Sequence, residues 1–216
     1  MATMKRDRKF KQSVYPNFGI MIVLAIILLK PDLSNILSSL QGNDEFGKYF
    51  FVMMLGFSVN AAILQLPYTD TPEAAWIYRA LPFTAHGDII SGATKAMLTK
   101  FLIPIYFIIA IPSMLLWGLT FAFQILLSVL GNILLVLVIV STRETLLPFT
   151  RVREMQQKGL NTVRAIFSMI FMVMMAGLIY ATKLIPVWIT AAICGIVYCC
   201  IIFIFRSIRN RKFKFA

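Results

Sequence analysis

The sequence predicts an all-α, polytopic integral membrane protein with about six transmembrane helices and short cytoplasmic interfacial helices. Of its 216 residues, 59% are hydrophobic and only 14% are charged, whereas soluble domains are about 45–50% apolar and about 25% charged. The longest uncharged run, from Phe101 to Thr142, has 42 residues. The 21 Lys and Arg residues, which give a net charge of +12, gather in a few short segments between apolar stretches. Such a chain cannot cover a water-facing surface, so lipid is its expected solvent.

Each span is predicted from an apolar stretch near bilayer length, because about 20 helical residues cross a hydrocarbon core about 30 Å thick. The run from Phe101 to Thr142 would make one helix about 63 Å long at about 1.5 Å per residue. It must therefore fold back, and Gly118 is the natural turn. Pro104 and Pro112 predict kinks in the helix before that turn. We expect one transmembrane domain over 1–216, with spans at 15–30, 46–66, 96–117, 119–140, 163–182 and 184–205.

The first span has a second interpretation. The basic segment Lys5–Lys11 followed by the apolar segment Phe18–Leu29 is also typical of a secretory signal peptide. Lys30-Pro31-Asp32 follows at once, and no Ala-x-Ala cleavage site is present, which favours a retained span.

The basic residues predict the orientation. With the N-terminus in the cytoplasm, 18 of the 21 Lys and Arg residues fall on the cytoplasmic side, and only Lys30, Lys48 and Lys183 fall outside. This asymmetry follows the positive-inside rule and predicts that both termini are cytoplasmic. The charge then reports membrane orientation, so no nucleic-acid partner is expected.

Catalytic and metal-binding patterns are missing from the sequence. Cys194, Cys199 and Cys200 lie within the last span without metal-ligand spacing, and are expected to be packing residues. His86 is the only histidine, and Asp88 is better explained as a helix cap than as its catalytic partner. There is no phosphate-binding Gly-x-x-x-x-Gly-Lys-Ser/Thr loop. We therefore predict no enzymatic activity, no metal and no cofactor for this chain.

Polar residues within the spans form one stripe. Thr120, Gln124, Ser128 and Asn132 follow one another at i+4 spacing in the span 119–140, and Asn60 in the span 46–66 is a similar candidate. Such a stripe predicts either hydrogen bonds between helices or the lining of a translocation path. No Asp, Glu, Lys or Arg lies deep within a span, which disfavours a channel or an ion-coupled carrier.

The cytoplasmic loop 67–95 is patterned. Thr71-Pro72-Glu73 is typical of a helix start, and the helix Glu73–Leu81 would gather Trp76 and Ile77 on one side. Such a helix is expected either to lie flat at the membrane interface or to dock into a groove of a soluble partner. A second helix is predicted to begin at Gly87-Asp88 and to run into the next span.

A four-residue segment, Leu-Pro-Phe-Thr, occurs in both long cytoplasmic loops, at Leu81–Thr84 and at Leu147–Thr150. Because the composition is biased, we infer no duplication from it.

Several segments together resemble bacterial ABC-type exporter permeases. They are Lys5–Lys11 followed by Tyr15–Gly19, then Glu73–Pro82, Gly92–Ala96 and Leu147–Thr150. The resemblance covers roughly residues 5–160 and corresponds to the later half of longer permeases of this class. It implies the membrane subunit of an exporter in a bacterial cytoplasmic membrane, surrounded by lipid and paired with a second copy or another membrane subunit.

The resemblance also implies a separate ATP-binding cassette subunit, on which short cytoplasmic helices dock. The implied coupling residues are Glu73, Trp76, Ile77, Tyr78 and Arg79, with Pro148, Phe149 and Arg151 as a second contact. The alternative is a membrane scaffold or assembly protein that recruits a cytoplasmic partner through the same loop.

Overall fold

The computed structural model describes residues 46–69, 86–119, 121–142, 147–148, 150–152 and 158–210, with four isolated positions nearer the N-terminus. The predicted span 15–30 and the predicted helix Glu73–Leu81 lie outside these residues, as do Thr120 and Phe149.

The described part of the chain is mostly helical, which confirms the all-α prediction. Its only strands are two residues long. The elements in chain order are α4 (Phe46–Met54), α5 (Phe57–Gln65), β1 (Tyr68–Thr69), α7 (His86–Met97), the π-helical turn η2 (Leu98–Leu102), α8 (Ile103–Trp117), α9 (Phe121–Ser141), β2 (Arg151–Val152), α10 (Lys158–Ala181), the 3₁₀ turn η4 (Thr182–Leu184) and α11 (Val187–Arg209).

Within the part of the chain that the structure describes, four helices are long and apolar enough to cross a membrane: Gly87–Leu115, Phe121–Ser141, Thr162–Leu184 and Val187–Arg209. They correspond to the predicted spans 96–117, 119–140, 163–182 and 184–205. Large apolar side chains on α8, α10 and α11 point away from the bundle, among them Phe107, Ile170 and Phe203. Outward-facing apolar helices of this length are typical of a membrane protein.

The predicted span 46–66 is not one continuous helix. It is divided at Leu55-Gly56 into two nine-residue helices, α4 and α5. The expected span 96–117, in contrast, begins earlier than predicted, because one helical rod runs from His86 through η2 to Trp117. The prediction that a helix begins at Gly87-Asp88 is confirmed, with Asp88 in its first turn.

Glycine and proline occupy special positions along this rod. Pro104 lies in the first turn of α8, directly after the π-helical turn η2, and Pro112 lies inside α8. A π-helical turn changes the local hydrogen-bond ladder, which suits a proline that lacks an N–H. Gly118 ends α8 with φ 88° and ψ 165°, a conformation that favours glycine, and so confirms the predicted turn.

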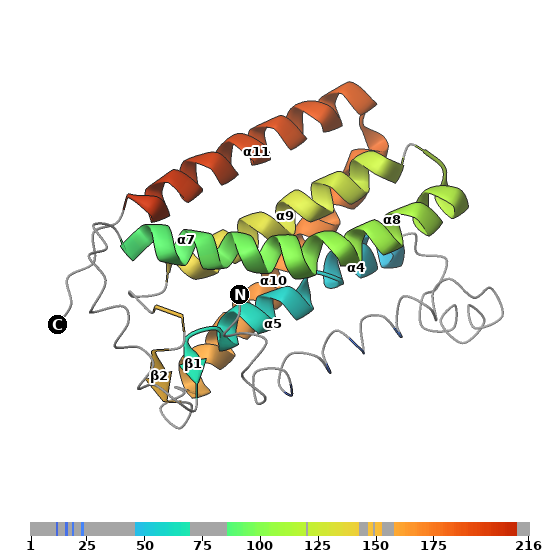
Figure 1. Ribbon diagram of the computed structural model, residues 1–216. Coiled ribbons are helices and arrows are strands. Elements are labelled where there is room, and N and C mark those ends of the chain that lie inside the picture. The colour runs from blue at the N-terminus through green and yellow to red at the C-terminus, as the bar shows by residue number, and fades with distance from the viewer. Residues whose placement is uncertain are drawn as a thin grey trace.

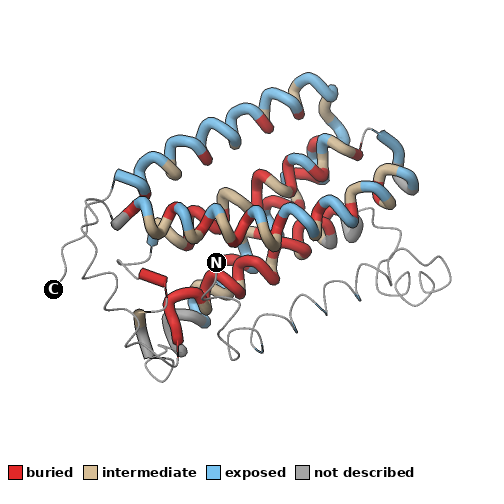
Figure 2. Tube along the Cα trace, viewed as in Figure 1, coloured by how far each residue is buried: buried red, intermediate tan, exposed pale blue. Residues whose placement is uncertain are grey.

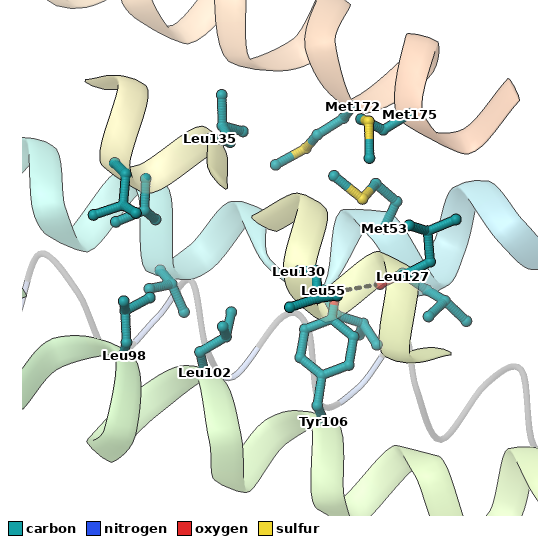
Figure 3. Close-up of a cluster of buried hydrophobic side chains, with 14 of the residues drawn as sticks. Met53, Leu55, Leu98, Leu102, Tyr106, Leu127, Leu130, Leu135, Met172 and Met175 are labelled. Carbon is teal, nitrogen blue, oxygen red and sulfur yellow. Dashed lines mark hydrogen bonds between the residues drawn. The ribbon is translucent and has the colours of Figure 1, made fainter. Parts of the chain in front are cut away.

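α9 is the central helix of the bundle. It contacts α4, α5, α8, α10 and α11 (Figure 1), and about half of it is buried, whereas α11 lies on the outside with most of its length exposed (Figure 2). The close-up in Figure 3 shows Met53, Met172 and Met175 facing one another beside α9. Met53 and Met175 close over Gly131, where a Cβ atom would lie 2.7 Å from the Met175 methyl group. The core is therefore built around α9, with Ser128 and Asn132 of the predicted polar stripe buried in it.

Candidate functional site

The interruption between α4 and α5 leaves backbone carbonyl groups to be satisfied inside the membrane. The Gly56 N–H donates to the Met53 carbonyl, three residues back, at 3.3 Å. The hydroxyl of Tyr106 on α8 donates to the Val52 carbonyl at 2.9 Å, and Asn132 Nδ2 on α9 donates to the Met53 carbonyl at 3.2 Å. An unpaired carbonyl in lipid costs several kcal/mol. Two side chains from other helices therefore stabilise the interruption.

Tyr106, Ser128 and Asn132 form one hydrogen-bonded cluster, which we call the polar cluster. Asn132 Nδ2 lies 2.7 Å from the Tyr106 hydroxyl, and the Ser128 hydroxyl lies 2.9 Å from it. Since the Tyr106 hydrogen goes to Val52, the Ser128 hydroxyl is the donor to Tyr106. All three residues are buried. The polar cluster thus fixes α8 and α9 against the end of α4.

Glycine is required at position 56 because the Asn132 side chain occupies the space that a Cβ atom would need. Its backbone is in the ordinary right-handed helical region, at φ −74° and ψ −13°. A Cβ atom there would lie 1.8 Å from Asn132 Oδ1 and 2.0 Å from Asn132 Cγ. The carboxamide of Asn132 therefore packs directly on the glycine, and any larger residue would displace it.

The stripe predicted from the sequence divides into two parts. Ser128 and Asn132 make hydrogen bonds between helices. Gln124 is half-buried and lines a pocket near the start of α9. Asn60 is 1% exposed, and neither its amide nitrogen nor its oxygen has a partner among the described residues. Asn60 lies one turn after Gly56, so both are on the same face of α5.

Tyr106 and Gly56 were not among the site residues predicted from the sequence. Tyr106 is the only tyrosine in the uncharged run from Phe101 to Thr142, where a hydroxyl in lipid needs a partner. A tyrosine in such an apolar run therefore predicts a buried hydrogen bond from its hydroxyl group. Gly56 had no comparable signal, because its role depends on Asn132, which is distant in the sequence.

A second candidate site is the end of the bundle where β1 and β2 lie, which we call the loop end (Figure 1). β1 follows α5 and β2 follows α9, and they pair in parallel, with Tyr68 opposite Arg151 and Thr69 opposite Val152. The Thr150 N–H adds a hydrogen bond to the Pro67 carbonyl at 3.0 Å. The two loops that leave α5 and α9 are therefore joined.

The joined segments have a common sequence. Leu66-Pro67-Tyr68-Thr69 resembles Leu147-Pro148-Phe149-Thr150, so the Leu-Pro-aromatic-Thr pattern occurs a third time in the chain, a copy that the sequence analysis overlooked. Pro67 and Pro148 both line a small cavity against Ile90 of α7. Pro148 is buried, so this expected coupling residue packs within the bundle, and Arg151 lies in β2.

α7 and α11 also meet at the loop end. A Cβ atom on Gly87 would lie 2.4 Å from the Arg209 carbonyl oxygen, so the two backbones are in close contact. Arg209 Nε pairs with Asp88 Oδ1 at 3.0 Å, and the Lys95 ammonium lies 4.7 Å from the centre of the Phe205 ring. The pair is exposed, 67% for Arg209 and 56% for Asp88, so the glycine contact contributes more to this junction than the charges do.

The described residues include no group of three or more His, Cys, Asp or Glu side chains placed to hold a metal ion. Cys194 is buried in the bundle, while Cys199 and Cys200 are exposed on α11, so only the first has the predicted packing role within the chain. No protein-family model, curated protein or solved structure matches the chain. Its function must be argued from the polar cluster and the loop end.

Proposed function

We propose that the chain is the transmembrane subunit of an ATP-driven, ABC-type exporter in a bacterial cytoplasmic membrane, coupled to a separate ATP-binding subunit. The observation that carries the proposal is the pairing of β1 with β2 at the loop end. This pairing joins α5 and α9, the helix after the interruption and the helix that supplies Asn132. A force on the loops would reach both sides of the polar cluster at once.

The proposed mechanism follows from this geometry. α5 and α9 run in the same direction and both end at the paired loops. When the ATP-binding subunit closes on ATP, the docked loops move, and α5 and α9 shift against α8. The bonds from Tyr106 to Val52 and from Asn132 to Met53 then break or exchange partners, which switches the bundle between inward and outward access.

The distribution of charge supports the proposed orientation. The positive-inside rule predicts 18 of the 21 basic residues on the cytoplasmic side, and the loop end, where Arg209 lies, would face that side. The docking residues in this proposal are Glu73, Trp76, Ile77, Tyr78 and Arg79, supported by the segment that contains Arg151. The aromatic-rich amphipathic helix predicted for these residues follows β1 in the sequence and would suit docking on a soluble subunit.

The second candidate is a membrane scaffold or assembly protein that recruits a cytoplasmic partner at the same surface. One observation favours it: Ser128 and Asn132 are engaged in hydrogen bonds within the bundle and do not line an open path. A scaffold requires a fixed loop end but no movement of the polar cluster.

The two candidates are separated by the identity of the partner. The full chain, tagged and purified in mild detergent from the bacterium that encodes it, should bring down a protein with a phosphate-binding Gly-x-x-x-x-Gly-Lys-Ser/Thr loop. Trp76→Ala combined with Arg79→Glu should abolish that complex, whereas Trp188→Ala, the matched change at the opposite end, should leave it intact. Absence of an ATP-binding partner from the wild-type preparation would refute the exporter. A stoichiometric partner without a nucleotide site, lost in the same variant, would establish the scaffold.

A further inference from the structure

Three buried side-chain atoms near the interruption have no hydrogen-bond partner among the described residues. They are Asn60 Nδ2, Asn60 Oδ1 and Asn132 Oδ1. Asn60 is 1% exposed and Asn132 is fully buried, so both side chains are closed off from solvent. A polar group without a partner is costly in lipid. An amide nitrogen donates and an amide oxygen accepts, so Asn60 Nδ2 and Asn132 Oδ1 are chemically suited to pair with each other.

The two asparagines lie near each other on α5 and α9. The Asn60 N–H donates to the Gly56 carbonyl at 3.1 Å, so these two residues are one helical turn apart on the same face. Asn132 Oδ1 lies 1.8 Å from the position that a Cβ atom would take on Gly56. Cβ atoms four residues apart on a helix are about 5–6 Å apart, and side chains lean toward the N-terminus of their helix. The Asn132 oxygen is therefore about one turn from Asn60, in the direction in which helical side chains lean.

The nitrogen of the Asn132 carboxamide is held by other elements. It donates to the Met53 carbonyl of α4 at 3.2 Å and lies 2.7 Å from the Tyr106 hydroxyl of α8. These bonds leave the oxygen of the carboxamide against Gly56, at the start of α5. The carboxamide can turn toward Asn60 only when at least one of them breaks. Asn60 and Tyr106 are therefore alternative partners of the same side chain.

The loop end determines which partner leaves. The pairing of β1 with β2 joins α5 to α9, so Asn60 and Asn132 keep their register when the loops move. Tyr106 is on α8, which lies outside this pairing. Shifts of about 1–2 Å between packed helices are typical of switching transitions. Such a shift would take Tyr106 away from α9 and leave the two asparagines together.

We propose that Asn60 is the second hydrogen-bond partner of Asn132. When α8 moves away, the Asn132 carboxamide turns and its Oδ1 accepts a hydrogen bond from Asn60 Nδ2. A contact between α8 and α9 is thereby exchanged for one between α5 and α9. The exchange rests on the proposed exporter function for the force that drives it, but the pairing can be tested without the ATP-binding subunit.

The test is a double-mutant cycle in two backgrounds, measured on the full chain by reversible unfolding in mixed detergent micelles. Asn60→Leu and Asn132→Ala should have additive effects in the wild type, because the two side chains are not bonded there. Tyr106→Phe removes the competing hydroxyl. In that background the same pair should show a coupling of about threefold in the unfolding equilibrium constant, the size of one average side-chain hydrogen bond between membrane helices.

Two single variants serve as controls. Asn60→Leu should be at least as stable as the wild type, because it replaces an unpaired amide with an apolar side chain of similar size. Ser58→Ala is the matched change on α5. The Ser58 hydroxyl is buried and donates to the Leu55 carbonyl at 3.2 Å, so this variant should not couple with Asn132→Ala in either background.

Two results would overturn the exchange. One is additivity of Asn60→Leu and Asn132→Ala in Tyr106→Phe as well as in the wild type. The other is a coupling of the same size in both backgrounds together with a less stable Asn60→Leu, which would make the two asparagines permanent partners. Neither result depends on the pull-down that tests the exporter, so the exchange and the exporter fail separately.

Discussion

The contact between Gly56 and Asn132 provides the sharpest test of the polar cluster. In Gly56→Ala, the new methyl group would lie 1.8 Å from Asn132 Oδ1 and 2.0 Å from its Cγ. The Asn132 carboxamide must therefore move away from position 56. It would lose its bonds to the Met53 carbonyl, the Tyr106 hydroxyl and the Ser128 carbonyl.

The magnitude follows from these losses. Side-chain hydrogen bonds between membrane helices are worth about 0.6 kcal/mol each on average. The amide nitrogen has two hydrogens, so the loss of its bonds accounts for about 1 kcal/mol. Overpacking of a core adds about 1–3 kcal/mol, and the greater helix propensity of alanine offsets up to about 1 kcal/mol of this cost. We expect Gly56→Ala to lower the free energy of unfolding by about 1–3 kcal/mol.

A double-mutant cycle isolates the cause. Asn132→Ala removes the carboxamide and should cost about 1 kcal/mol by itself. Adding Gly56→Ala to that variant should then cost almost nothing, because the obstructing group is gone, and this gives a coupling of about 1 kcal/mol or more. Gly177→Ala is the matched control, since nothing lies within 4 Å of a Cβ atom at that glycine.

The assay is reversible unfolding in mixed detergent micelles, followed by far-ultraviolet circular dichroism. Additive effects of Gly56→Ala and Asn132→Ala would refute the proposed contact. So would a Gly56→Ala protein as stable as Gly177→Ala.

Three further predictions concern the polar cluster and the loop end. Tyr106→Phe should lower the free energy of unfolding by about 1–2 kcal/mol in the same assay, because a buried carbonyl loses its donor; an unchanged value would contradict this. Gly87→Ala should cost about 1–3 kcal/mol, since it meets backbone carbonyls of α11 at 2.4 and 2.5 Å, whereas Gly92→Ala on the same helix should be neutral; equal effects would disprove the close contact. Thr69→Cys with Val152→Cys should form a disulfide on mild oxidation, because adjacent strands are about 4.8 Å apart; mass spectrometry without that cross-link would exclude the pairing.

Local signals predicted the four long spans and the turn after α8. An apolar helix of bilayer length is determined by its own composition, so the four long spans were found from hydrophobicity alone. Gly118 was predicted as a turn because the uncharged run is too long for one helix, and Asp88 was predicted as a helix start from its type and position. These features depend on residues that are close together in the sequence.

The interruption at Leu55-Gly56 could not be predicted in the same way. Glycine is common in transmembrane helices, where it usually continues the helix. What decides the outcome here is the supply of donors from other helices: Tyr106 donates to the Val52 carbonyl, and Asn132 donates to the Met53 carbonyl, which also accepts the Gly56 N–H. Such a long-range contact leaves a visible trace only as single polar residues in apolar segments. The sequence analysis noted Asn132 for this reason, but left its partner open.

The polar cluster and the loop end together favour a moving part over a static one. Between the two lies α5, which is held at its start by the contact of Gly56 with Asn132 and beyond its end by the pairing of β1 with β2. A fixed scaffold gains nothing from a helix interrupted inside lipid, where each carbonyl without a partner costs several kcal/mol. A transporter does gain, because hydrogen bonds between side chains and freed carbonyls can exchange partners without unfolding a helix. The amide of Asn60, which has no hydrogen-bond partner among the described residues, lies on the same face of α5 as Gly56 and would take part in such an exchange.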